Sequence, residues 1–292
     1  MAHVVMCHGI GYQYKHRASS LDGWYEALHT GMTDAALAVP EPEQVSAVYY
    51  GNCYRTLAGT KGAADADEFD GIPPLHAGDV RDPLEWALLE AFAEGTEEPP
   101  RDGKGAGQAA LRRLEGSARL GRPPARVVIW LARQVRRYLD PADTVRACAQ
   151  QRFARVVTPD TRVVVAHSLG TVVAYEALCA HPEWKVDTFV TLGSPLGVGE
   201  IRERLVPRPG ADGTLPWPNV GQWINVAAEE DPIALRKELA PAFGERVRDR
   251  LVTNTARLHP ARYVLGGHSL LRYLTTVEVA EAVSLALADS ER

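Results

Sequence analysis

One serine stands where two sequence patterns meet, in the stretch "TRVVVAHSLGTVVAYEAL" from Thr161 to Leu178. The β-branched residues before Ser168 predict a buried strand, and the apolar spacing after Gly170 predicts a helix. A serine at a tight turn from strand to helix presents its hydroxyl as a nucleophile. The familiar pattern for this turn is G-x-S-x-G, and Ala166 replaces the first glycine here. Because alanine adds only one methyl group, we expect the turn to form and Ser168 to be a nucleophile; the alternative is a serine that only caps the helix.

A nucleophile that attacks an acyl carbonyl creates an oxyanion, which needs two hydrogen-bond donors about 3 Å away. The first amides of a helix point out of its N-terminus, and the helix dipole favours negative charge there. We therefore predict the amide of Leu169 as one donor. A second glycine-rich loop, "HGIG" from His8 to Gly11, follows the first predicted strand. Its glycines let the backbone turn and approach a substrate closely.

Together, "MCHGIG" and "AHSLG" resemble the α/β-hydrolase fold in its bacterial lipase and esterase branch. Members of that branch carry an H-G-x-G loop after an early strand, and some small lipases also have alanine at the first elbow position. The resemblance covers roughly residues 1 to 50 and 127 to 290. It implies an oxyanion hole formed by the amides of Ile10 and Leu169. We expect His8 to brace this loop by hydrogen bonding. Tyr12 and Tyr14 lie near the loop and could close the site over the substrate, with simple packing as the alternative.

The same resemblance implies a catalytic triad in the chain order serine, acid, histidine. Three histidines follow Ser168, namely His181, His259 and His268. His268 lies in the glycine-flanked stretch "LGGHSLLRY" just before the last predicted helix, where this fold carries its histidine. We predict His268 as the general base, with His259 as the alternative.

The acid of the triad is expected after a late strand. The stretch "INVAAEEDPI" offers Glu229, Glu230 and Asp231 there. Asp231 precedes Pro232, and this D-P turn resembles the one after the acid-bearing strand of many relatives. We predict Asp231 as the acid, with the two glutamates as alternatives. Its role would be to hold the imidazole tautomer and stabilise the imidazolium without taking the proton.

Predicted strands and helices alternate along the chain, and the ends of such strands can position the serine, the acid and the histidine. Apolar and β-branched runs predict strands at 3–7, 45–50, 161–167, from 187 and at 222–228, and helical spacing predicts helices at 21–37, 83–93, 127–139, from 170 and at 275–287. This alternation is typical of a mostly parallel sheet covered on both faces, so we predict an α/β fold with one domain over residues 1–292.

One segment departs from that pattern, because glycine, proline and acidic residues dominate from about 55 to 126. A structureless loop of that length is unusual in a compact domain. We predict an inserted cap or lid that is partly helical. Its acidic cluster (Asp65, Asp67, Glu68, Asp70) fits no known cation loop, so we interpret it as a solvated turn.

The composition excludes some kinds of binding partner and favours one cellular location. The 292 residues carry a formal net charge of -5, which gives no sign of a nucleic-acid binder. No apolar run approaches the roughly 18 residues needed to span a membrane, and no signal peptide is recognisable. The four cysteines, Cys7, Cys53, Cys148 and Cys179, form no close pair, so we expect reduced thiols in a cytoplasmic protein.

The triad and the oxyanion hole predict a serine hydrolase that cleaves a carboxylic ester or thioester of a small or lipid-like acyl substrate. We expect no metal and no organic cofactor, since this chemistry requires neither. Three alternatives stay open: a peptidase or amidase on the same triad, an acyltransferase with an alcohol as the acceptor, and a silent interaction module that kept the fold.

Overall fold

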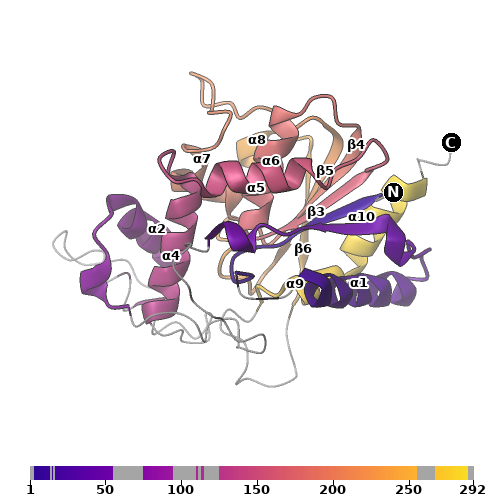
Figure 1. Ribbon diagram of the computed structural model, residues 1–292, viewed down its shortest axis with the longest axis horizontal. Coiled ribbons are helices and arrows are strands. Elements are labelled where there is room, and N and C mark those ends of the chain that lie inside the picture. Colours follow the sequence, from indigo (N-terminus) through magenta and orange to yellow (C-terminus); the bar gives the residue numbers. More distant parts are fainter. Residues whose placement is uncertain are drawn as a thin grey trace.

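The computed structural model describes residues 3–13, 15, 17–54, 75–94, 110, 113–114, 125–254 and 267–288. Within these residues, six parallel strands form one sheet in the order β2-β1-β3-β4-β5-β6 (Figure 1). The strands are β1 (Val4–Cys7), β2 (Val45–Val48), β3 (Val163–His167), β4 (Val186–Leu192), β5 (Val220–Ala228) and β6 (Val247–Val252). The predicted α/β class with a parallel sheet is therefore confirmed, while the α/β-hydrolase assignment stays a prediction.

Helices cover both faces of the sheet because strand side chains point alternately to either face. In β1, Val4 and Met6 join one apolar cluster, and Val5 and Cys7 join the other. Figure 1 shows three helices together on the Val4 face, namely α1 (Arg17–Asp34), α9 (Leu270–Leu274) and α10 (Val277–Ala288). Two helices cover the Val5 face, α5 (Val145–Ala154) and α6 (Leu169–Ala180).

The cluster on the Val5 face continues into further elements at the periphery. These are the α-helices α2 (Pro83–Glu94), α4 (Ala125–Leu139), α7 (Gly199–Arg202) and α8 (Ala240–Phe243). Short 3-10 turns complete the described elements: η1 (Pro42–Gln44), η2 (Gly51–Tyr54), η3 (Ala77–Asp79) and η4 (Pro195–Gly197).

The strand order places a topological switch point between β1 and β3. From β1 the chain moves to β2 on one side, and β3 then pairs with β1 on the other side. The helices that follow these two strands, α1 and α6, pack on opposite faces of the sheet. In open parallel sheets a crevice forms at such a point, at the carboxyl ends of the strands, and ligands bind there. His8 follows β1 and Ser168 follows β3, so both lie at this edge.

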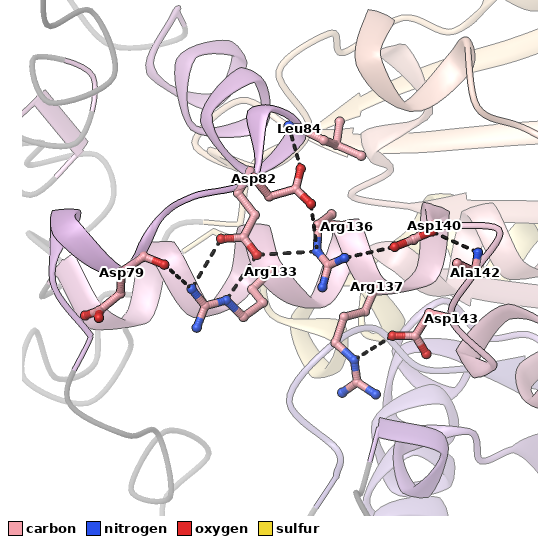
Figure 2. Close-up of polar contacts among 10 residues, drawn as sticks. Asp79, Asp82, Leu84, Arg133, Arg136, Arg137, Asp140, Ala142 and Asp143 are labelled. Atoms are coloured by element: carbon pink, nitrogen blue, oxygen red, sulfur yellow. Dashed lines mark hydrogen bonds and ion pairs between the residues drawn. The ribbon is translucent and has the colours of Figure 1, made fainter.

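The described part of the inserted segment is attached to the rest of the molecule by a row of charged side chains (Figure 2). Its helix α2 packs against α4. On α4, Arg133 donates to the buried carboxylate of Glu85 at 3.0 and 3.3 Å and to the carbonyl of Asp79 at 2.9 Å. The guanidinium of Arg136 lies within 3.6 Å of three carboxylates, those of Asp82, Glu85 and Asp140. A lid function for the segment stays a prediction, and its acidic cluster at 65–70 lies outside the described residues.

The prediction of four reduced cysteines is wrong for two of them. Cys53 and Cys148 form a disulfide that joins η2 to α5 across a sequence separation of 95 residues. Cys7 and Cys179 are free. The sequence does not indicate this pair, because the inserted segment separates the two cysteines. Only the fold brings their Cα atoms to 5.9 Å. Since disulfides persist mainly in oxidising compartments, the pair removes one ground for the cytoplasmic prediction.

In the part of the chain that the structure describes, no helix combines the length and apolar character that a membrane crossing requires.

Candidate active site

Ser168 sits in a strained turn between β3 and α6. Its backbone has φ 54° and ψ −132°, a region that L-residues with side chains rarely occupy and that costs on the order of 1–3 kcal/mol. The amide of Ser168 donates to the carbonyl of Leu192 at 3.0 Å, and Thr171 donates twice to the carbonyl of Ser168. The side chain makes no capping hydrogen bond to α6. The Ser168 hydroxyl therefore does not cap α6 through a hydrogen bond, and its role as a nucleophile stays a prediction.

Small residues on either side of the turn allow this geometry. A Cβ atom on Gly170 would lie 2.3 Å from the carbonyl oxygen of His8 and 2.8 Å from that of Cys7, so only glycine lets α6 approach β1. Ala166 is fully buried in β3 opposite Cys7, and its methyl group is accommodated in the core. The departure from G-x-S-x-G at this position thus leaves the turn intact.

The predicted oxyanion loop lies directly against Ser168. A Cβ atom on Gly9 would lie 2.6 Å from Ser168 Cβ and 3.1 Å from Ser168 Oγ. Ile10 follows Gly9 in this loop, and Leu169 is the first residue of α6. Leu169 thus follows Ser168 directly and Ile10 follows the glycine that contacts it, while the donation of their amides to an oxyanion stays a prediction.

His8 holds this loop in place from a fully buried position. Its Nε2 atom accepts from the amides of Tyr50 and Gly51 at 3.1 and 3.3 Å, and its Nδ1 atom donates to the carbonyl of Gly9 at 2.6 Å. The ring stacks on Tyr50 with centroids 4.3 Å apart. Burial lowers the pKa of His8 to about 3, opposed by its bond to Gly9 and aided by the charge on Lys15. These contacts match the expected bracing role of a neutral imidazole.

Tyr12 belongs to the same cluster of rings. Its ring stacks on His8 with centroids 4.7 Å apart, and its hydroxyl accepts from Trp24 Nε1 at 3.2 Å. Its carbonyl accepts a hydrogen bond from the Tyr49 hydroxyl. These contacts hold Tyr12 against the loop that begins at His8. Contact between Tyr12 and a substrate stays a prediction.

The structure brings Asp231 and His268 together, although 37 residues separate them. The Nδ1 atom of His268 lies 2.9 and 2.8 Å from the two carboxylate oxygens of Asp231. Asp231 follows β5, and His268 lies two residues before the start of α9. Both side chains are almost entirely shielded from solvent. A hydrogen bond from imidazole Nδ1 to a buried carboxylate fixes the tautomer with a free Nε2 atom, as a general base requires.

Other donors complete the shell around the Asp231 carboxylate. The hydroxyl of Tyr273 donates to Oδ2 at 2.6 Å and accepts from the amide of Ala228 at 2.8 Å. The amides of Ile233 and Ala234 donate to Oδ1 at 2.8 and 3.2 Å. Burial alone would raise the pKa of Asp231, but His268 and the donors from Tyr273 and Ile233 hold that pKa well below its usual range. The acid is therefore a carboxylate at any ordinary pH.

The backbone around His268 is fixed from two sides. A Cβ atom on Gly267 would lie 2.9 Å from the carbonyl carbon of Glu230, so the histidine loop lies directly on the acid loop. The Asn254 side chain donates to the carbonyl of Gly267 at 3.2 Å. Of the alternative acids, Glu230 accepts from the amide of Asn254, and Glu229 is exposed. His259, the alternative base, lies outside the described residues.

Sequence reasoning missed two residues of this shell. Tyr273 lies on α9, five positions after His268, and its hydroxyl points toward Asp231. Its position on that helix is the one feature of the sequence that could have indicated this contact. Gly193 follows β4 in the "LGSP" stretch and has φ 54°. A Cβ atom there would lie 2.4 Å from Asp231 Oδ2 and 3.0 Å from His268 Nδ1. Glycine at this position leaves the room that the side chains of Asp231 and His268 occupy.

Among the described residues, no group of three histidine, cysteine, aspartate or glutamate side chains is arranged to hold a metal ion. No model of a known protein family matches the chain, and no curated protein matches its sequence.

Proposed function

We propose that the chain is a serine hydrolase of the α/β-hydrolase fold that cleaves a carboxylic ester or thioester, with Ser168, His268 and Asp231 as its triad. The observation that carries the proposal is the bond between His268 Nδ1 and the buried Asp231 carboxylate at the same sheet edge as Ser168. A serine hydroxyl is a poor nucleophile without a base, and the base needs a group that fixes its tautomer. The strained turn at Ser168 and the switch point between β1 and β3 add support.

In the first half-reaction, Ser168 Oγ attacks the acyl carbonyl while its proton passes to His268 Nε2. Asp231 stabilises the resulting imidazolium through Nδ1–H. The carbonyl oxygen becomes an oxyanion that accepts from the amides of Ile10 and Leu169. The tetrahedral intermediate collapses when the bond to the leaving oxygen or sulfur breaks, and His268 returns the proton to that atom.

In the second half-reaction, water replaces the leaving group. His268 Nε2 takes a proton from the water as its oxygen attacks the acyl-enzyme, and a second oxyanion forms in the same hole. The bond to Ser168 Oγ then breaks, and the proton returns to that oxygen. The product is the carboxylic acid, and the free enzyme is restored. An alcohol in place of water would give an ester, which is the acyltransferase alternative.

Labelling with a fluorophosphonate probe tests the nucleophile, because such probes react with activated serines. We expect labelling of the wild-type chain and none of Ser168→Ala. Ser19→Ala is the matched control, since Ser19 is exposed on α1, and it should label like wild type. Equal labelling of Ser168→Ala would remove Ser168 from the mechanism. A folded wild-type chain that takes no label would favour the interaction module.

A substrate series then separates the hydrolase classes. We expect turnover of p-nitrophenyl esters and of an acyl thioester, with no turnover by Ser168→Ala. Peptide p-nitroanilides should react far more slowly, because an amide nitrogen is a poorer leaving group. Faster cleavage of the anilides would establish a peptidase or amidase, and ester formation with an added alcohol in preference to hydrolysis would establish an acyltransferase.

A further inference from the structure

A second imidazole lies beside His268. His167 is the last residue of β3 and is almost fully buried. Because strand side chains alternate, His167 points to the same face as Val163 and Val165, the face on which α9 packs. There its Nε2 atom lies 3.1 Å from the backbone carbonyl of His268, and the two ring centroids are 4.5 Å apart.

These contacts define the state of the His167 ring. A carbonyl oxygen can only accept, so Nε2 carries the proton and donates it. Nδ1 then has a lone pair, and it has no hydrogen-bond partner among the described residues. Burial and the neighbouring His268 hold the pKa of His167 well below its usual range, against the smaller opposing effect of Asp231. The ring is therefore neutral and acts as a fixed donor.

We propose, on the basis of the function proposed above, that His167 is a positioning residue that sets the placement of the catalytic His268 through its Nε2–H bond to the His268 carbonyl. Asp231 fixes the His268 ring at Nδ1, and Asn254 fixes the preceding carbonyl of Gly267. The bond from His167 fixes the backbone of His268 itself. Since Ser168 directly follows His167, the nucleophile and the backbone of the base are held by neighbouring residues of one turn.

This arrangement has a consequence for the proton transfer. The Nε2 atom of His268 must meet the Ser168 hydroxyl within hydrogen-bond reach, and a displacement of about 1 Å costs on the order of 10²-fold in rate. A neutral His167 also places no positive charge beside His268 when the imidazolium forms. The proposed role therefore affects the chemical step and leaves substrate binding alone.

Two amide substitutions test the bond, since glutamine places an amide nitrogen near the Nε2 position and asparagine places it near Nδ1. We expect His167→Gln to keep most of kcat, while His167→Asn loses on the order of 10²-fold in kcat with KM almost unchanged. Fluorophosphonate labelling rates should follow kcat. His181→Gln and His181→Asn are the matched controls on a half-exposed histidine at the end of α6, and neither should change kcat.

Equal kcat for the two His167 variants at equal folded fraction, or a loss confined to KM, would overturn the proposal. Proton NMR of the His268 Nδ1–H in its bond to Asp231 gives a readout that does not depend on turnover. We expect that resonance to persist in His167→Gln and to broaden or shift in His167→Asn. If wild type neither labels nor turns over, the proposed function fails, and the NMR comparison still decides whether His167 positions His268.

Discussion

Two regions of the molecule bring acids and bases together in opposite ways. At the carboxyl edge of the sheet, one fully buried carboxylate, Asp231, is held by an imidazole and by neutral donors such as the Tyr273 hydroxyl. Along α4, three arginines face carboxylates of the inserted segment and of the residues just after α4, and most of these side chains are partly exposed. The first arrangement fixes the position of one proton. The second attaches a segment through charges that can substitute for one another.

Redundancy is the main difference between these regions. Arg136 lies near three carboxylates, so the loss of one leaves two. Asp231 is the one carboxylate that the structure places against His268 Nδ1 among the described residues. Solvent also acts differently, because water and salt screen exposed pairs and leave buried hydrogen bonds almost unaffected. Substitutions at the sheet edge should therefore have large effects that salt does not change.

The largest effect is expected for Asp231→Asn. Asparagine keeps an acceptor for Tyr273 but presents an N–H group to His268, which favours the tautomer with a protonated Nε2 that cannot act as a base. We predict a fall in kcat of about 10⁴-fold, measured on a p-nitrophenyl ester at equal folded fraction. The control is Asp140→Asn on the α4 side, which should keep full activity. Retention of activity by Asp231→Asn would mean that one of the neighbouring glutamates orients the base.

A smaller but still large effect is expected for Gly193→Ala. The new Cβ atom would lie 2.4 Å from Asp231 Oδ2, so the acid or the backbone must move. We predict a loss in kcat on the order of 10²-fold, the cost of a displacement of about 1 Å. Gly213→Ala separates this clash from backbone strain, since Gly213 also has a positive φ but nothing within 4 Å. A Gly193→Ala variant as active as that control would contradict the close packing.

Local patterns in the sequence predicted the parts of the site that depend on short segments. The β-branched run before Ser168 and the helical spacing after it lead directly to β3 and α6. The "HGIG" loop follows β1, and Gly9 lies directly against Ser168, while its role as an oxyanion loop stays a prediction. Each of these features depends on residues that are close in the sequence, where propensity and spacing carry most of the information.

The parts that the sequence did not predict depend on contacts between distant segments. The Cys53–Cys148 disulfide joins residues on either side of the inserted segment in the sequence. The Tyr273 hydroxyl reaches Asp231 only because α9 packs beside the acid loop. The strand β6 was missed for a local reason. Arg248, Asp249 and Arg250 interrupt its apolar pattern, as is usual for an edge strand that is partly exposed.

A pH dependence of stability should come from the sheet edge, through His8. Its folded pKa is about 3, and an unfolded histidine has a pKa of about 6.5. As the pH falls through 6.5, the unfolded chain takes up a proton that folded His8 does not, so the free energy of unfolding decreases until about pH 3. Each site of this kind contributes at most about 1.4 kcal/mol per pH unit. Between pH 6.5 and 5 the usual carboxylate pKa values are not yet reached.

Urea unfolding of wild type and His8→Gln at pH 7.5, 6 and 5 measures this contribution. We expect a flatter pH profile for His8→Gln, because glutamine cannot take up the proton in the unfolded chain. The raised pKa of the buried Glu176 acts in the opposite direction but is common to both proteins, so the difference between them isolates His8. Ser19→Ala at an exposed position of α1 is the control and should leave the profile unchanged, because neither side chain titrates in this range. Parallel profiles for wild type and His8→Gln would show that folding does not lower the pKa of His8.

The smallest effect is expected for Asp140→Asn in the charged row of α4. Asp140 accepts from Arg136 at 3.0 Å through Oδ2 and from the amide of Ala142 through Oδ1, and asparagine keeps the second bond (Figure 2). We predict a loss of about 0.3–0.5 kcal/mol in the free energy of unfolding at low salt, the size usual for a partly exposed ion pair between residues i and i+4. The loss should disappear in 1 M NaCl, where the screening length is about 3 Å. The kcat defect of Asp231→Asn should be the same at both salt concentrations, because its partners are buried. If salt changed both defects alike, the contrast between the two regions would be wrong.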